Sequence, residues 1–177
     1  FSINFDMLSF ETLTYIPGVS VYNVFEAEYN EKDEYHAVIH NELMSNSYTD
    51  SYVRGEHHAT TVLTQIAMIE LIGKYLVLPY WNLLPNHKID DIVVNRVENG
   101  FNSLTGIQKI SYLQEYLFLH GYTLDISGIL DSKTTKALSG LGLNLPAGIV
   151  TFDIFFKVYN SVPINKITVK RRHLISK

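Results

Sequence analysis

Histidine and carboxylate residues are the side chains of this sequence that could do chemistry, and their spacing decides which chemistry is open to them. The chain has seven histidines and no cysteine. His36 and His40 are four residues apart in a strand-like segment, so we expect about 13 Å between them, too far to share one metal ion. His57 and His58 are adjacent at a helix start, where neighbouring side chains diverge. The spacing predicts surface or hydrogen-bonded histidines and no metal site.

Glu70 is the carboxylate with the most unusual surroundings, because it lies on the apolar stripe of the longest predicted helix. A carboxylate in such a place is hydrogen-bonded or has a raised pKa. Arg54 and Lys74 are the structural partners that the sequence offers. General acid–base catalysis at Glu70 is the alternative interpretation. The further acid–base candidates near it are Glu56, His57 and His58.

Several classes of enzyme are excluded by missing residues. The absence of cysteine removes disulfides, thiolate zinc sites, iron–sulfur clusters and the nucleophile of L,D-transpeptidases. The sequence also lacks G-x-S-x-G, Ser-x-x-Lys and the glycine-rich loops that hold phosphates. We therefore expect a protein that is not an enzyme and that uses no cofactor.

The composition is poor in charge and rich in aromatic residues. Charged residues make up 18% of the 177 residues, with twelve tyrosines and nine phenylalanines, whereas about 25% charged residues is usual. Little charge is left to cover the surface, so we predict that partners cover part of it.

Acidic and basic residues are concentrated at opposite ends of the chain. Residues 1–50 contain nine acids and one base, and residues 163–177 contain five bases and no acid. A basic end can bind nucleic acid or anionic lipid. Nothing else in the chain is basic enough for nucleic acid, so we expect no nucleic-acid partner. A solvated end, or a strand that pairs with an acidic neighbour, is the simpler interpretation.

The first part of the sequence, residues 1–98, has the pattern of a small α/β domain. Residues 19–29 and 35–44 predict a hairpin, and the polar residues 45–50 predict a loop. Apolar residues at three- and four-residue spacing predict a long helix over 58–77. Residues 91–97 predict another strand. Tyr80 and Trp81, between the helix and this strand, either pack beneath the helix or stack on a sugar ring.

The second part, residues 104–162, is predicted to be all helical. One helix runs from about 108 to a stop at Gly121, a second over 131–138, and a third over 151–159. Asp131 and Thr151 are the expected N-caps of the second and third helices. Residues 163–177 predict an extended basic tail. The fold class is therefore α+β: a small α/β domain with an antiparallel-containing sheet and one long helix, followed by a three-helix module.

The helical part contains a characteristic order of residues. Leu113-Gln114 is followed by Gly121-Tyr122, then by the segment 128–131 (Gly-Ile-Leu-Asp), Thr134 and Ala137-Leu138, and a further glycine turn leads to the third helix. This order resembles the peptidoglycan-binding-domain-1-like family, a three-helix module. The predicted small core consists of Leu113, Leu117, Leu138 and Phe156.

The resemblance implies a peptidoglycan-binding groove where the first helix meets the turn into the second. Its residues would be Tyr122, Asp125, Asp131, Thr134 and Thr135. Asp131 and Thr134 also have a plain interpretation as helix-capping residues. A second surface, for contact with partner proteins, is predicted on the third helix and the basic tail. Its residues would be Phe155, Phe156, Tyr159, Lys170, Arg171 and Arg172.

The segment 60–81 also resembles part of the curli-secretion-channel lipoprotein family. Its Glu70-Leu71-Ile72-Gly73 and Pro79-Tyr80-Trp81 match that family's Glu-Leu-Ile-Gly helix core and Pro-Tyr-Trp exit. Together the two resemblances imply the periplasm of a Gram-negative bacterium, with association to the outer membrane through partners. We expect a non-catalytic structural subunit of an envelope-spanning secretion, pilus or flagellar-motor complex, which contacts peptidoglycan or other subunits through its helical module. A cell-wall hydrolase with an unrecognised site, and a subunit that makes protein contacts without wall binding, are the alternatives.

Overall fold

Four strands followed by six α-helices make up the described part of the chain, which is therefore of mixed α+β class. The computed structural model describes residues 2–29, 35–41, 48–50, 56–84 and 88–175. Side chains are described for residues 2, 4–24, 60–84, 88–146 and 148–175. The chain divides into two compact units, Phe1–Arg96 and Val97–Lys177, which we call the N-terminal unit and the C-terminal unit.

A long central strand, β2, organises the sheet of the N-terminal unit. The strands pair antiparallel in the order β1-β2-β3-β4, with bounds β1 Ser2–Leu8, β2 Tyr15–Tyr29, β3 Tyr35–Asn41 and β4 Tyr48–Asp50. The first part of β2 pairs with β1 and its last part pairs with β3. The β2–β3 pairing confirms the predicted hairpin. The sequence pattern missed β1, and β4 lies within the segment predicted to be a loop.

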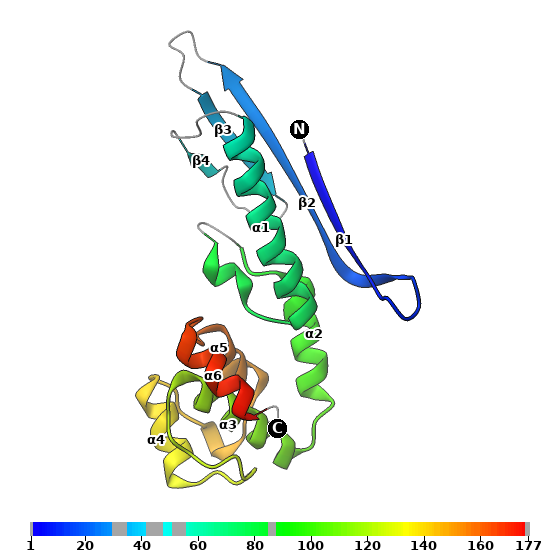
Figure 1. Ribbon diagram of the computed structural model, residues 1–177. Helices are drawn as coiled ribbons and strands as arrows, with labels where there is room; N and C mark the ends of the chain where they lie inside the picture. The colour runs from blue at the N-terminus through cyan, green and yellow to red at the C-terminus, as the bar shows by residue number, and fades with distance from the viewer. Residues whose placement is uncertain (1, 30–34, 42–47, 51–55, 85–87, 176–177) are drawn as a thin grey trace. The chain divides into compact units, whose positions relative to one another are not determined.

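One face of this sheet packs against α1 (Glu56–Leu76), which lies along β2 in Figure 1. Val19 and Val21 point to that face and form a buried cluster with Ala67 and Leu71 of α1. Because side chains alternate along a strand, Ser20 and Tyr22 point to the other face, and both are exposed. α1 confirms the long helix predicted over 58–77.

The end of α1 is a tight helix stop with a valine in a left-handed conformation. Val77 has a φ of 53°, and Leu78 donates its N–H to the carbonyl oxygen of Gly73 at 2.9 Å. This bond is the 6→1 bond of a Schellman motif, in which glycine is usual at the left-handed position. The short helix η1 (Tyr80–Leu83) follows. Tyr80 lies so close to Gly73 that a Cβ at that position would collide with its ring.

α2 (Asp91–Asn102) is a helix, so the strand predicted over 91–97 is wrong. Asp90 caps its start, because its Oδ1 accepts the backbone N–H groups of Ile92 at 2.9 Å and Val93 at 3.3 Å. Val93, Val97 and Phe101 recur every four residues, and all three are buried. The cap and the helical period outweigh the preference of the valines and isoleucine for strands. The division between the two units falls within this helix.

Three helices of the C-terminal unit correspond to the three predicted ones: α3 (Gly106–His120), α4 (Ser132–Gly140) and α5 (Phe152–Asn160), with the short helix η2 (Pro146–Gly148) before α5. Gly121 ends α3 with a φ of 114°, and Asp131 caps α4 as predicted. Thr151 is the N-cap residue of α5, as predicted, although its side chain makes no capping hydrogen bond.

α6 (Lys166–Ile175) is a helix where an extended tail was predicted. The Oδ1 of Asn165 accepts the N–H groups of Ile167 at 2.8 Å and Thr168 at 3.0 Å, which is a helix N-cap. Spaced aliphatic residues favoured a strand in the sequence, but this local cap starts a helix. α6 packs against α3 and is part of the C-terminal unit.

The core of the C-terminal unit contains Leu113, Leu117 and Leu138, which are fully buried as predicted. Phe155 completes this core, whereas the predicted Phe156 is only partly buried. None of the helices in the described ranges combines the length and the apolar character needed to cross a membrane.

Candidate functional site

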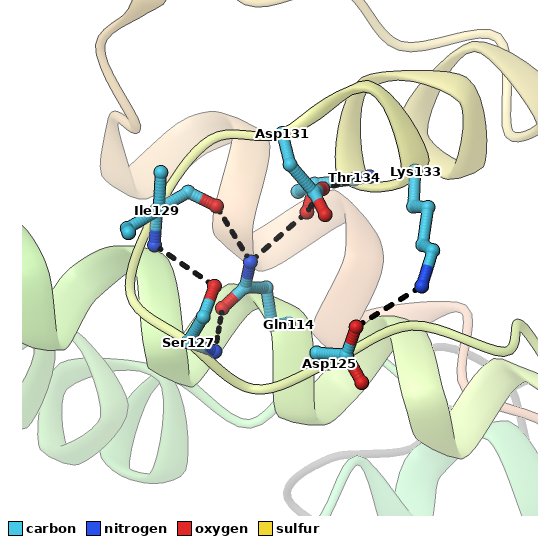
Figure 2. Close-up of polar contacts among 7 residues, drawn as sticks. All are labelled: Gln114, Asp125, Ser127, Ile129, Asp131, Lys133 and Thr134. Carbon is cyan, nitrogen blue, oxygen red and sulfur yellow. Dashed lines mark hydrogen bonds and ion pairs between the residues drawn. The ribbon is translucent and has the colours of Figure 1, made fainter.

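Gln114 of α3 holds the turn that leads into α4, as Figure 2 shows. Its fully buried amide makes four hydrogen bonds. Nε2 donates to the carbonyl oxygen of Ile129 at 2.8 Å and to the hydroxyl of Thr134 at 2.9 Å. Oε1 accepts the N–H groups of Ser127 and Gly128, both at 2.9 Å. All donor and acceptor positions of the amide are used, so one side chain fixes the turn to α3.

Asp131 and Thr134 complete this network at the start of α4. Asp131 Oδ1 accepts the hydroxyl of Thr134 at 2.6 Å and its N–H at 2.7 Å. These two bonds, the hydroxyl first, hold the pKa of Asp131 below its usual value. Thr134 is fully buried, so its hydroxyl serves Asp131 and Gln114 and does not reach the surface. The capping interpretation is confirmed for both residues, and Thr134 is removed from the predicted groove.

The other predicted groove residues keep exposed or partly exposed side chains: Asp125 and Thr135 are exposed, and Tyr122 is partly buried. Asp125 forms an ion pair with Lys133 at 3.0 Å, visible in Figure 2, and its carboxylate raises the pKa of Lys133. Thr135 donates its hydroxyl to backbone carbonyls of the preceding turn. Tyr122 is partly buried beside Gly140, where a Cβ would lie 2.7 Å from the tyrosine hydroxyl oxygen.

A groove of about 420 Å³ lies beside α4. It is bordered by the turn before α4, by one side of that helix, and by the segment that follows it. Its lining residues are Leu130, Thr135, Leu138, Ser139, Leu143, Asn144, Leu145 and Gly148. Leucine side chains and uncharged polar groups line it together, so it suits a ligand that presents both methyl and hydroxyl or amide groups. Thr135 is the one predicted site residue in this lining.

Sequence reasoning missed the wall of this groove after α4. The segment Leu143-Asn144-Leu145 alternates apolar and polar side chains and is followed by Pro146, so it cannot continue α4. Such an extended segment beside a helix can form a groove wall. The alternation of apolar and polar residues before Pro146 is the sequence feature from which this wall could have been predicted.

Phe155 and Tyr159 are core residues, which corrects the aromatic contact surface predicted on α5. Both are fully buried. The ring of Phe155 stacks on Phe101 and on Tyr112, with centroid distances of 4.9 Å and 4.7 Å. Phe156 is partly exposed and is the one predicted aromatic contact residue that a partner can reach.

Arg171 attaches α6 to α3, so it is not the freely exposed contact residue that the sequence predicted. It donates to the carbonyl oxygens of Phe118 at 2.6 Å and Tyr122 at 3.1 Å. Its guanidinium carbon lies 4.7 Å from the centroid of the Phe118 ring. The last carbonyls of a helix lack intrahelical partners and attract cations. Lys170 and Arg172 remain exposed on α6.

A second cavity, of about 160 Å³, lies between α3 and α6. Its lining residues are Tyr112, Glu115, Tyr116, Leu119, Arg172 and Ile175. Burial raises the pKa of Glu115, and the charge of Arg172 partly offsets this effect. Burial likewise raises the pKa of Tyr112. With one carboxylate in its lining, the cavity lacks the carboxylate pair of most glycoside hydrolases.

The acid–base candidate Glu70 is buried in the N-terminal unit, with 1% of its surface exposed. It has an interaction partner in the structure, and Lys74 donates its Nζ to the carbonyl oxygen of Ser20 at 2.8 Å. The other acid–base candidates, Glu56, His57 and His58, fall outside the described side chains. So does Arg54, the other expected structural partner of Glu70. The same holds for His36 and His40.

Tyr80 and Trp81 are buried, which confirms that they pack in the core rather than stack on a sugar. The hydroxyl of Tyr80 donates to Asp90 Oδ2 at 2.7 Å. Burial, followed by this bond to a carboxylate, raises the pKa of Tyr80. In the described part of the chain, no group of three or more His, Asp or Glu residues could hold a metal ion.

Comparisons of this chain with protein-family models, with curated proteins and with solved structures gave no match. The geometry above therefore carries the functional argument.

Proposed function

We propose that the protein is a non-catalytic structural subunit of an envelope-spanning assembly in a Gram-negative bacterium, and that its C-terminal unit contacts peptidoglycan or partner subunits. The proposal places the protein in the periplasm, associated with the outer membrane through its partners. The observation that carries it is the groove beside α4, with its leucine, hydroxyl and amide lining. Peptidoglycan presents methyl, hydroxyl and amide groups together, which such a lining can contact.

The hydrogen bonds of Gln114 also support the proposal. Three of the residues that carry the resemblance to peptidoglycan-binding modules have a physical task here. Gln114 binds the turn, Asp131 caps α4, and a Cβ on Gly128 would lie 2.9 Å from the Ser111 hydroxyl oxygen. A turn fixed in this way keeps Leu130 and Thr135 in position on the groove wall, and a preorganised wall lowers the cost of binding.

The proposal is tested by sedimenting the purified protein with isolated sacculi. Ser139→Trp fills the groove from an exposed position on α4, so we expect the protein to move from the pellet to the supernatant. The matched control is Ser132→Trp, the same change at the exposed first residue of α4, which should pellet like the wild type.

Two results would overturn parts of the proposal. If the wild type stays in the supernatant, wall binding is wrong, and the C-terminal unit serves protein contacts alone. If sacculi lose turbidity with the wild type and not with Glu70→Gln, the protein is a hydrolase and its non-catalytic role is wrong.

A further inference from the structure

The short helix α6 has an unusual composition for a helix that ends a packed unit. None of its residues is fully buried. Ile167 is 63% exposed and Leu174 is 65% exposed, and Lys166 and Lys170 are exposed beside them. An exposed aliphatic residue is common by itself. A group of aliphatic residues within a segment of five bases and no acid is not explained by the fold.

The inner side of α6 is fixed, and this determines which side chains remain available. Arg171 binds the carbonyl end of α3 through two hydrogen bonds, and Ile175 lines the cavity between the two helices. Arg171 and Ile175 are four residues apart and therefore lie on one side of α6. The helix is attached by this side, so the remaining part of its circumference is presented outward.

Ile167, Lys170 and Leu174 lie on the flank next to this attached side, and all three are exposed. They follow one another at spacings of three and four residues, so they form one stripe. Lys166 lies one turn before Lys170 on the same side. The two lysines have long flexible stems whose ammonium groups can reach anionic headgroups while the aliphatic neighbours enter the boundary with the acyl chains.

We propose that this exposed stripe of α6, made of Lys166, Ile167, Lys170 and Leu174, docks the protein on an anionic lipid surface. The positive charge of the segment and the negative charge of such a bilayer are complementary, and a surface of mixed lysine and aliphatic residues matches the mixed headgroup and acyl boundary. Nucleic acid would use the lysines but offers nothing for Ile167 and Leu174. This docking goes beyond the proposed envelope role, because it gives the protein a direct contact with a membrane. In this contact α6 lies on the bilayer without crossing it.

The test is flotation of the full chain with phosphatidylcholine vesicles that contain or lack phosphatidylglycerol. We expect binding that requires phosphatidylglycerol and that falls at about 1 M salt, where the Debye length shrinks to about 3 Å. Because each lysine near an anionic surface contributes about fivefold, Lys166→Glu with Lys170→Glu should weaken binding by roughly 25-fold or more. Ile167→Ser with Leu174→Ser should weaken it by about tenfold while the lipid preference remains.

The matched control is Lys136→Glu with Lys157→Glu, which changes the net charge equally at exposed positions of α4 and α5. It should bind vesicles within about twofold of the wild type. Circular dichroism verifies that every variant is folded.

Four outcomes would overturn the proposal. The first three are equal binding to both kinds of vesicle, an equal loss of binding in the control, and binding of the protein to double-stranded DNA in place of lipid. The fourth is a change of oligomeric state caused by the lysine variants without a change in vesicle binding, which would assign the stripe to an acidic surface of a second copy.

Discussion

Gln114 shows how a single buried side chain can replace regular structure. Residues 127–131 form a turn outside the helices, and the Gln114 amide supplies hydrogen-bond partners for the backbone of three of those residues. A leucine of similar size could fill the same space but could not satisfy the donors and acceptors around it. Buried polar groups that lose their partners cost more than the hydrogen bond itself contributes.

Gln114→Leu should therefore destabilise the C-terminal unit by about 3–5 kcal/mol. Two N–H groups lose their partner, and one carbonyl and one hydroxyl lose one of their two partners. Urea denaturation followed by circular dichroism measures the effect. Gln108→Leu is the control on the same helix. Gln108 belongs to the exposed capping box of α3, and its loss should cost about 1 kcal/mol. Equal effects of the two substitutions would show that the network contributes no more than an exposed cap.

Val77 illustrates the opposite case, a residue whose type conflicts with its backbone conformation. A β-branched residue in the left-handed region costs about 1–2 kcal/mol, and glycine removes that cost while it adds flexibility to the unfolded chain. Val77→Gly should therefore stabilise the N-terminal unit by about 0.5–1 kcal/mol, measured as a raised midpoint in thermal unfolding.

The control for that prediction is Val94→Gly, the same change inside α2, where the backbone is right-handed helical. It should destabilise by about 0.5–1 kcal/mol. If both glycines destabilise equally, the conformation of Val77 carries no strain.

At the scale of the elements, the sequence predicted the helices in which the apolar period and the end signals point to the same structure. The predictions were wrong where the helix caps and the strand preference of β-branched residues point to different structures. α1, α3, α4 and α5 have an apolar period together with clear stops, and all four agree with the predictions. α2 and α6 contain β-branched residues that favour strands locally. Both segments are helical because Asp90 and Asn165 cap them and because they pack against other elements. A local sequence pattern contains no information about such packing.

The candidate site was predictable only in part, for a related reason. Asp131 could be assigned as a cap because capping depends on residues three apart in sequence. The burial of Thr134, Phe155 and Tyr159 depends on packing between helices far apart in sequence. The groove also needs the segment after α4 to fold alongside that helix, which residue types alone do not specify.

The cap of α4 should make the stability of the C-terminal unit depend on pH in the acid range. The folded-state pKa of Asp131 is lowered by its bonds from Thr134, so the stabilisation is complete above the unfolded-state value near 4 and is lost as pH falls through the lower folded-state value. Asp131→Asn keeps an acceptor oxygen without the titration. Denaturation midpoints measured between about pH 5 and pH 2 should therefore fall less steeply for this variant.

The raised pKa of Glu115 acts in the opposite direction, because protonation of that buried carboxyl favours the folded state as pH falls. For this reason the comparison uses the difference between wild type and Asp131→Asn, in which the contribution of Glu115 cancels. Parallel pH profiles for the two proteins would contradict the assignment of the acid dependence to the cap.

At the scale of the whole molecule, the two units have separate reasons to be stable. The N-terminal unit depends on a sheet covered by one helix, with Val19, Val21, Ala67 and Leu71 at the centre. The C-terminal unit depends on a helical core and on the Gln114 network. The division falls inside α2, between Arg96 and Val97, so a continuous helix carries residues of both.

Because the Val77 helix stop and the Gln114 network lie in different units, their variants should act on different unfolding transitions. Differential scanning calorimetry of the full chain should resolve two transitions. Gln114→Leu should lower the midpoint of one by roughly 12–40 °C, and Val77→Gly should raise the midpoint of the other by about 2–8 °C. The double variant should show both shifts, since effects at distant sites add. A single transition that both substitutions move would mean that α2 couples the units into one cooperative structure, and the two-unit description of stability would be wrong.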